Sequence, residues 1–343
     1  MKIIRAPALE ALLIEALTRS GTPDDIARTV ATSLVDANLK GVDSHGAVRI
    51  GMYLDQVEQG YTQPAARPEI IRETSSSAIV RGNRGFGIYT LSYALDIAIQ
   101  KAKAHQIAAV GLVDSTHTGR LGWYAERAAA QNVIALLTGG GANRHPLHQS
   151  VAPHGGAKRA LATNPYAIGI PGGEFGTMLV DMSTSTTAEG KLRLHRATGK
   201  PVPSGWLIDR DGAPTNDAAA FYDGGAILPF GGHKGYGLAV AAELLCDALL
   251  GESYELNWFI IAINIEAFRS VDEFAHESQD ILQRIKAVPP SSGNAEVLIP
   301  GEPEQRAEQR RHADGIPIDD AVWDAMATAM RKVGVEPDSQ EST

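Results

Sequence analysis

The segment GVDSHGAVR, residues 41–49, concentrates side chains that could carry out chemistry. It holds a carboxylate, a hydroxyl, an imidazole and a guanidinium, contributed by Asp43, Ser44, His45 and Arg49. An imidazole with an ordinary pKa of about 6.5 exchanges protons near neutral pH, and a guanidinium grips a carboxylate through two parallel hydrogen bonds. This set therefore suits a small substrate that carries a carboxylate next to a carbonyl or hydroxyl. The competing interpretation is a capped helix end with Arg49 in solvent.

Two further polar positions follow predicted strands, where α/β proteins often bind small molecules. His117 and Arg120 come after an apolar strand predicted over residues 107–113. Asp181 ends a strand predicted over residues 178–181. A carboxylate at a strand end could orient a histidine for proton transfer. The plainer alternatives are a surface loop for His117 and a helix or turn cap for Asp181.

A glycine-rich segment, residues 231–237, precedes a helix predicted over residues 238–250 and contains His233 and Lys234. Glycines before a helix expose backbone N–H groups that bind anions, so the segment is a candidate anion site. The alternative is that the segment only leads into the helix, with glycines that let the chain pack closely. The dinucleotide fingerprint Gly-x-Gly-x-x-Gly and the P-loop are both absent, so a nucleotide would have to bind by another route.

Residue composition argues against several classes of protein. The chain has 343 residues, a formal net charge of -9 and no basic run, so we expect no nucleic-acid partner. Its single cysteine, Cys246, rules out an internal disulfide, and its longest apolar run, residues 258–265, is too short to cross a bilayer. We therefore expect a cytoplasmic protein with no membrane partner. We also expect no metal, because His145, His148 and His154 are loosely spaced and lack accompanying cysteines or paired carboxylates.

Apolar periodicity predicts both helices and strands along the chain. Helices are expected over residues 9–17, 23–40 and 50–57, on either side of the corner at residues 41–49. Strands are expected at 70–71, 78–80, 107–113, 133–138, 167–170, 178–181 and 258–265, with a strand and turn over 297–302, and further helices at 90–104, 123–131, 238–250, 266–285, 304–313 and 319–333. Residues 183–203 should form an ordered loop over a site, with some helix.

Short motifs along nearly the whole chain together resemble one enzyme family. They are Asp43-Ser44-His45-Gly46-x-x-Arg49, Ser115-x-His117-x-Gly119, Thr163-Asn164-Pro165, Asp181-x-Ser183-Thr184-Ser185, Gly190-Lys191, Gly232-His233-Lys234-Gly235 and Pro300-Gly301-Glu302. The set is similar to the non-Rossmann malate/L-lactate dehydrogenase family, which includes ureidoglycolate, sulfolactate, diketogulonate and piperideine-2-carboxylate oxidoreductases. The C-terminal third and residues 115–122 look most like the hydroxycarboxylate dehydrogenase B branch, from which Arg49 departs.

The resemblance implies an α/β fold with a non-Rossmann mixed sheet flanked by helices, beside a helical unit built from both chain ends. It places a helical substrate unit at residues 1–75, to which residues 286–343 return, and a cofactor-binding domain at residues 76–285. It also implies a homodimer with the active site near the subunit interface. The reaction would be hydride transfer between NAD or NADP and a small 2-hydroxy or 2-oxo acid.

The resemblance also assigns roles to individual residues. His45 would be the general acid and base, held by Asp181 with help from Ser44; Arg49 would bind the substrate carboxylate. His117 would line the same pocket. The residues implied for cofactor binding are His45, Gly119, Arg120, Leu121, Leu179, Val180, Asp181, Met182, Ser183, His233, Lys234, Asn257, Gly301, Glu302, Pro303 and Glu304.

Three matters stay open from the sequence. Arg193, His195, Arg196 and Lys200 could meet the 2′-phosphate of NADP, or form a solvated basic loop. The same pocket could serve a reductase of cyclic imino acids such as piperideine- or pyrroline-2-carboxylate, because an imine carbon accepts hydride as a carbonyl does. A non-catalytic nucleotide-binding protein is the alternative of another class, and the intact polar set argues against it.

Overall fold

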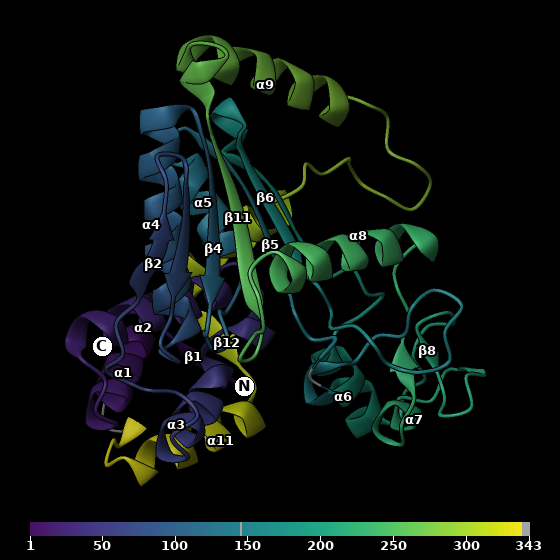
Figure 1. Ribbon diagram of the computed structural model, residues 1–343. Coiled ribbons are helices and arrows are strands. Elements are labelled where there is room, and N and C mark those ends of the chain that lie inside the picture. Colours follow the sequence, from purple (N-terminus) through teal and green to yellow (C-terminus); the bar gives the residue numbers. More distant parts are fainter. Residues whose placement is uncertain (145, 338–343) are drawn as a thin grey trace.

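The computed structural model describes residues 1–144 and 146–337, and a seven-stranded mixed sheet forms its centre (Figure 1). The strand order is β2-β3-β4-β11-β5-β6-β7. The bounds are β2 Glu69–Glu73, β3 Ser77–Arg81, β4 Ile107–Val113, β5 Val133–Gly140, β6 Tyr166–Pro171, β7 Thr177–Met182 and β11 Asn257–Asn264. β3 and β4 run parallel, and the other neighbouring pairs are antiparallel. The predicted mixed α/β sheet is therefore confirmed.

Alternating apolar residues give the central strands a buried face. Val110 and Leu112 of β4 are fully buried, as is Ile260 of the neighbouring β11. They belong to one apolar cluster with residues of α4 (Gly87–His105) and α5 (Gly122–Ala129). α5 lies so close to β6 that a Cβ on Gly169 would overlap the carbonyl oxygen of Ala125. The sheet therefore fixes the position of the loop that leads into α5.

A helical unit from both chain ends packs beside the sheet, as predicted (Figure 1). It contains α1 (Ala6–Arg19), α2 (Asp24–Leu39), α3 (Ile50–Glu58) and α11 (Asp320–Lys332). The ends are joined by antiparallel pairing of β1 (Lys2–Ile4) with β12 (Ile316–Ile318). These two strands were not predicted, because three residues are too few to show a period. β2 belongs to the sheet, although residues 69–73 fall within the range that we assigned to the helical unit.

A smaller unit lies to one side of the sheet and has its own apolar cluster, which includes Val151, Leu192 and Ile227 (Figure 1). Its elements are α6 (Glu189–Thr198), β8 (Leu207–Ile208), β9 (Pro214–Thr215), α7 (Ala219–Tyr222), β10 (Ala226–Ile227) and α8 (His233–Glu243), with a π-helical turn at Leu244–Ala248. The expected loop at residues 183–203 thus contains a helix. α8 begins at His233, ahead of the predicted residue 238. Gly235 in its first turn allows close packing, since a Cβ there would overlap the carbonyl oxygens of Phe230 and Thr184.

One other predicted strand was wrong, and one predicted helix begins later than expected. Residues 297–299 form no strand; Ile299 instead donates its N–H to the Glu302 carboxylate (3.0 Å), in the turn that starts α10 (Glu302–Asp314). α9 (Val271–Lys286) begins after a capping box between Ser270 and Glu273, because residues 265–267 form a separate 3-10 turn. In the described part of the chain, the helices are too short or too polar to cross a lipid bilayer.

The packing of α5 on β6 leads to a matched pair of glycine substitutions. We expect Gly169→Ala to lower the free energy of unfolding by about 1–3 kcal/mol, because the added methyl group must push α5 away from the sheet. Gly237→Ala in α8 is the control, since a Cβ there meets nothing within 4 Å, and it should stabilise the helix by about 0.4–1 kcal/mol. Urea unfolding of the two variants would measure this difference. Equal stability would contradict the close packing.

Candidate active site

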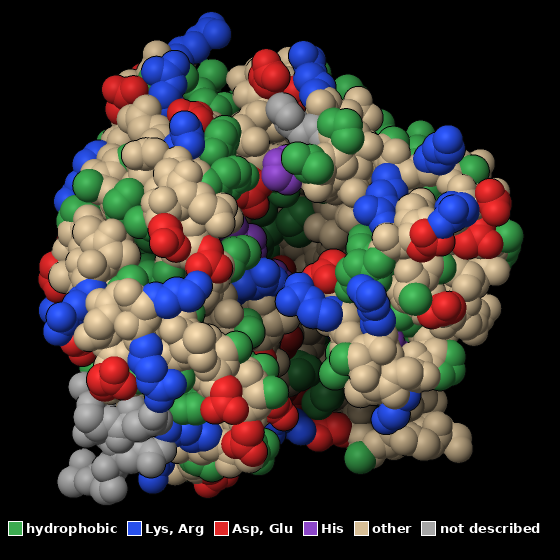
Figure 2. All heavy atoms as spheres, turned by 90° about the horizontal axis from the view of Figure 1, so that it is seen from below, with side chains coloured by type: hydrophobic (Ala, Val, Ile, Leu, Met, Phe, Trp, Pro, Cys, Tyr) green, Lys and Arg blue, Asp and Glu red, His purple; other side chains and the backbone are tan. Residues whose placement is uncertain are grey.

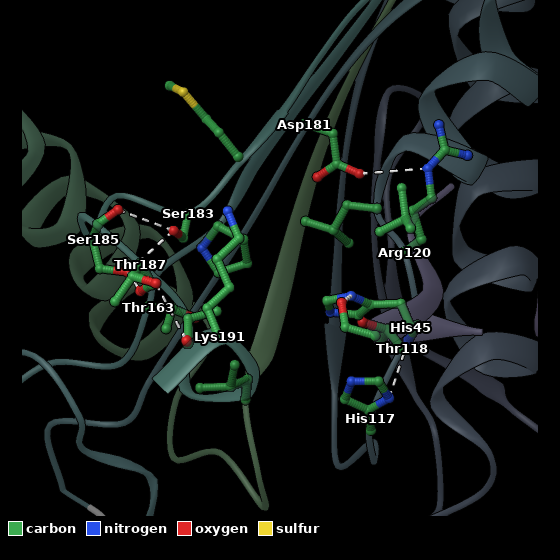
Figure 3. Close-up of a pocket in the computed structure, with 18 of the residues that line it drawn as sticks. His45, His117, Thr118, Arg120, Thr163, Asp181, Ser183, Ser185, Thr187 and Lys191 are labelled. Carbon is green, nitrogen blue, oxygen red and sulfur yellow. Dashed lines mark hydrogen bonds and ion pairs between the residues drawn. The ribbon is translucent and has the colours of Figure 1, made fainter. Parts of the chain in front are cut away.

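A cavity of about 590 Å³ lies between the helical unit, the ends of β4 and β7, and the smaller unit that contains α6. Figure 2 shows the molecule hollowed at its centre, with lysine and arginine side chains beside the hollow. In Figure 3, His45 and His117 lie on one wall, and Lys191 of α6 lies on the opposite wall with several serines and threonines. The structure thus brings the predicted corner together with both predicted strand ends.

The corner consists of two 3-10 turns, Asp43–His45 and Ala47–Arg49, separated by Gly46. The buried Asn38 of α2 holds both turns: its Oδ1 accepts from the Ala47 N–H (2.7 Å), and its Nδ2 donates to Asp43 Oδ1 (2.6 Å). A side chain at Gly46 would overlap that amide. From α10, Arg311 donates two hydrogen bonds to the Asp43 carboxylate, at 2.6 and 3.0 Å. Asp43 is therefore a structural residue that fixes the corner.

His45 faces the cavity, with its Nδ1 atom 3.0 Å from Ser44 Oγ. Burial, together with the weaker effect of the positive charges of Arg49 and Arg120, lowers the pKa of His45 to about 4. The imidazole is consequently neutral at pH 7. This corrects our expectation of an ordinary pKa, which did not account for the burial of the ring between two arginines.

His117 is stacked against His45, with ring centroids 5.8 Å apart. Its Nδ1 accepts a hydrogen bond from the Gly119 N–H (3.3 Å) and lies 2.8 Å from the hydroxyl of Tyr53. Because Nδ1 is an acceptor, the proton of the neutral ring is on Nε2. Burial, together with Arg49 and His45, holds the pKa of His117 well below its usual value, so this ring also stays neutral.

Arg49 is a cation close to both histidines, although it does not itself line the cavity. Its Nε donates to the Ser44 carbonyl (2.7 Å), and its Nη1 lies 3.9 Å from the Met52 sulfur. Among residues 1–144 and 146–337, no carboxylate lies within ion-pair distance of this guanidinium. A ligand carboxylate could therefore pair with Arg49 without displacing an internal partner.

Asp181 does not hold His45. Its Oδ2 accepts from the Gly122 N–H (2.7 Å) at the start of α5 and lies 3.9 Å from Nε of Arg120 (Figure 3). This is the capping role that the sequence left open as an alternative. The predicted contact between Asp181 and His45 is wrong because the end of β7 faces the start of α5, whereas His45 comes from the helical unit.

Arg120 connects the sheet to the helical unit. It is 2% exposed, and its Nη1 donates to Asp36 of α2 (2.9 Å) and Glu126 of α5 (2.8 Å). Burial raises the pKa of Asp36 to about 6 despite the neighbouring arginine. The Nη2 atom of Arg120 is buried and has no hydrogen-bond partner in the described structure. Such an atom is costly to leave unsatisfied, and it lies next to Gly122, where an added Cβ would come within 2.7 Å of it.

The residues predicted for cofactor binding divide into two groups. Those that line the cavity are His45, Gly119, Arg120, Leu121, Asp181, Met182, Ser183 and Glu304. Those that do not line it are Leu179, Val180, His233, Lys234, Asn257, Gly301, Glu302 and Pro303. The second group has structural contacts in several cases: Asn257 donates to the carbonyls of Cys246 (2.8 Å) and Gly251 (2.7 Å), and Glu302 pairs with Lys286 (2.6 Å).

The basic residues near α6 are placed outside the cavity. Arg193 pairs with Glu189 (2.6 Å), His195 lies 3.2 Å from the carbonyl of Lys200, and Arg196 stacks on the ring of Tyr222. The lysine of this helix that does line the cavity is Lys191.

A metal site was not expected from the three histidines His145, His148 and His154. Of these, His145 lies outside the described residues. Within residues 1–144 and 146–337, no three potential metal ligands gather in one place.

Sequence reasoning missed Glu255, Phe230, Trp258 and Thr163 as lining residues. Glu255 lies just before β11 in a segment without a recognisable pattern, so only the pairing of β11 in the sheet shows where its carboxylate lies. Thr163 and Lys191 belong to motifs that the sequence did reveal, and that signal could have placed them at the site.

Comparisons with known proteins agree with this geometry. The family model "Malate/L-lactate dehydrogenase" matches residues 4–327. The chain is 34% identical to a malate dehydrogenase of Pyrococcus abyssi over 97% of this chain and 96% of that one, and 33% identical to hydroxycarboxylate dehydrogenase B of Escherichia coli over 98% and 96%. The solved sulfolactate dehydrogenase of Methanocaldococcus jannaschii superposes with a TM-score of 0.89 at 32% identity, covering 98% of this chain and 99% of that one. The chain therefore belongs to the malate/L-lactate dehydrogenase family.

Proposed function

We propose that the protein is an NAD(P)-dependent oxidoreductase that interconverts a small 2-hydroxy acid and its 2-oxo acid. Family membership supports oxidoreductase activity on hydroxy acids. The finer proposal rests on two neutral histidines that line the cavity, His45 and His117, and on the unpaired cation Arg49 beside them. These are a proton carrier, a hydrogen-bond donor and a carboxylate anchor.

The remainder of the cavity fits a nicotinamide cofactor. The volume of the whole cavity, about 590 Å³, falls within the usual range for cofactor pockets. Gly119, with φ of 72°, brings backbone close to this space. Hydroxyl side chains that could bind ribose and phosphate groups line the opposite wall: Thr163, Ser183, Ser185, Thr186 and Thr187. When bound, the cofactor would supply or accept the hydride.

The chain's own residues would perform the remaining steps. Arg49 would hold the substrate carboxylate, and this would direct the reacting oxygen toward the stacked rings of His45 and His117. Nε2–H of His117 would donate to that oxygen while negative charge develops on it. In oxidation, neutral His45 would take the hydroxyl proton; in reduction, protonated His45 would return it. Ser44, 3.0 Å from Nδ1, would orient the His45 ring.

Substrate binding would also change the proton affinity of His45. The charge of Arg49 is one of the causes that lower the pKa of this imidazole. A carboxylate paired with Arg49 would offset that charge, and so would raise the pKa of His45 toward its ordinary value. Binding of the anionic oxo acid would thereby favour the protonated form that reduction needs.

The first test is replacement of the proposed proton carrier. We expect His45→Gln to lower kcat by roughly 10²–10⁴-fold, because general acid help is lost while the size of the side chain is kept. His105→Gln, at the exposed end of α4, is the matched control and should leave kcat unchanged. NADH and NADPH oxidation would be followed with a panel of 2-oxo acids and cyclic imino acids. Full turnover in His45→Gln would refute the assignment, and turnover with imino acids alone would favour the reductase alternative.

The lowered pKa of His45 predicts different pH profiles for the two directions. Oxidation needs the neutral ring, which prevails above pH 4, so kcat/KM for the hydroxy acid should be nearly level from pH 6 to 8. Reduction needs the protonated ring, which becomes rarer as pH rises, so kcat/KM for the oxo acid should fall by up to about tenfold per pH unit. Initial rates in both directions would measure this. A reductive kcat/KM that stayed constant over this range would contradict the low pKa.

We also propose a homodimer. α9 is amphipathic, with Leu282 buried, yet Ile281, Ile285 and the nearby Val288 are 49%, 47% and 56% exposed. Exposed apolar groups on one helix commonly mark a protein interface. Sedimentation equilibrium should therefore give twice the chain mass of 36.4 kDa. A monomer at micromolar concentration would exclude this assembly.

A further inference from the structure

Glu255 is a cavity-lining carboxylate that the proposed mechanism does not use. It lies in the segment before β11, and two groups fix it: the hydroxyl of Tyr61, 3.3 Å from its Oε2, and the backbone of His117. The segment itself is anchored, since the ring of Tyr254 packs on Tyr61 at 4.8 Å and its hydroxyl donates to the Tyr61 carbonyl (3.2 Å). The Glu255 carboxylate is therefore held beside His117.

The charged groups around Glu255 come from several elements. Arg49, from the corner, lowers the pKa of Glu255, although the two side chains form no ion pair within 4 Å. Burial has the larger effect and raises that pKa to about 7, against the hydrogen bonds from Tyr61 and the His117 backbone. His45 and His117 are neutral. At pH 8, Arg49 and Glu255 thus place one half-buried cation and one half-buried anion near the two histidines.

We infer that Glu255 determines the substrate class: it selects 2-oxo acids that carry a single carboxylate and a hydroxyl group on C3, and it disfavours a second carboxylate. The inference rests on the proposed function, because Arg49 must hold the carboxylate next to the reacting carbon. The family name itself covers two kinds of substrate: lactate, which has one carboxylate, and malate, which has two. Glu255 distinguishes between these two kinds of substrate.

Charge and hydrogen bonding near Glu255 distinguish the two kinds of substrate. Arg49 can neutralise one substrate carboxylate, and a second one near Glu255 would be a like charge in a poorly solvated space. A C3 hydroxyl, in contrast, could donate a hydrogen bond to the Glu255 carboxylate. Arg120 also lines the cavity, but it is already paired with Asp36 and Glu126. Lys191 could compensate a second anion, but it lies on the opposite wall (Figure 3) and is exposed, so solvent screens its charge.

The experiment compares three oxo acids at pH 8 with the preferred nicotinamide cofactor. Hydroxypyruvate has one carboxylate and a C3 hydroxyl, pyruvate lacks the hydroxyl, and freshly dissolved oxaloacetate has a second carboxylate. For the unmodified protein, we expect kcat/KM for hydroxypyruvate to exceed that for oxaloacetate by at least roughly tenfold. Glu255→Gln keeps the shape and removes the charge, so it should raise the efficiency with oxaloacetate relative to pyruvate by about tenfold.

Two further variants keep the test decisive. Glu252→Gln changes an exposed carboxylate in the same segment and should leave every ratio unchanged. Glu255→Asp withdraws the charge without removing it, and should shift the ratio in the same direction by less; it replaces the glutamine variant if that one fails to fold. Turnover with unchanged ratios in the Glu255 variants would overturn the inference alone. No turnover of any oxo acid by the unmodified protein would overturn the proposed function and the inference with it.

Discussion

The active-site corner depends on one buried amide. Asn38 donates to Asp43 and accepts from the Ala47 backbone, and so it holds the turns on both sides of Gly46. Arg311, from near the other end of the chain, completes the arrangement by binding Asp43 through two hydrogen bonds. His45 and Arg49 are therefore positioned by α2 and α10 together. This explains why a helical unit built from both chain ends is needed to place His45 in a cavity at the strand ends, with Arg49 beside it.

Burial then determines how these side chains behave. The same packing that fixes His45 and His117 removes them from water, and the neighbouring arginines add positive charge, so both rings are kept neutral. A neutral ring suits removal of a proton, whereas donation requires the pKa to rise. The unpaired Arg49 provides a way for an anionic substrate to cause that rise, since one contact would anchor the substrate and offset the charge near His45. Substrate binding and proton transfer would then be coupled through a single guanidinium.

The two walls of the cavity contribute different chemistry. The wall from the helical unit and the β4 loop carries the histidines, while the wall near α6 carries hydroxyl groups and Lys191 (Figure 3). Arg120 links the β4 loop to α2 through Asp36 and to α5 through Glu126. Glu255 adds a negative charge where a substrate side chain would lie. This division would allow the substrate preference to change at Glu255 without altering the residues that transfer the proton.

The sequence by itself determined the mixed α/β class, the family and the corner, because these depend on local patterns: the periods of apolar residues, helix start signals and short motifs with fixed spacing. It also identified His45, Arg49, His117 and Arg120 as residues of one site, and all except Arg49 line the cavity. Only the tertiary structure decided which of them touch. Asp181 caps α5 instead of holding His45, Asn257 supports the turn before β11, and Glu255 reaches the cavity from a segment without a motif. The pKa of His45 was also beyond the sequence, because burial and the approach of two arginines arise from residues that only the folded chain brings together.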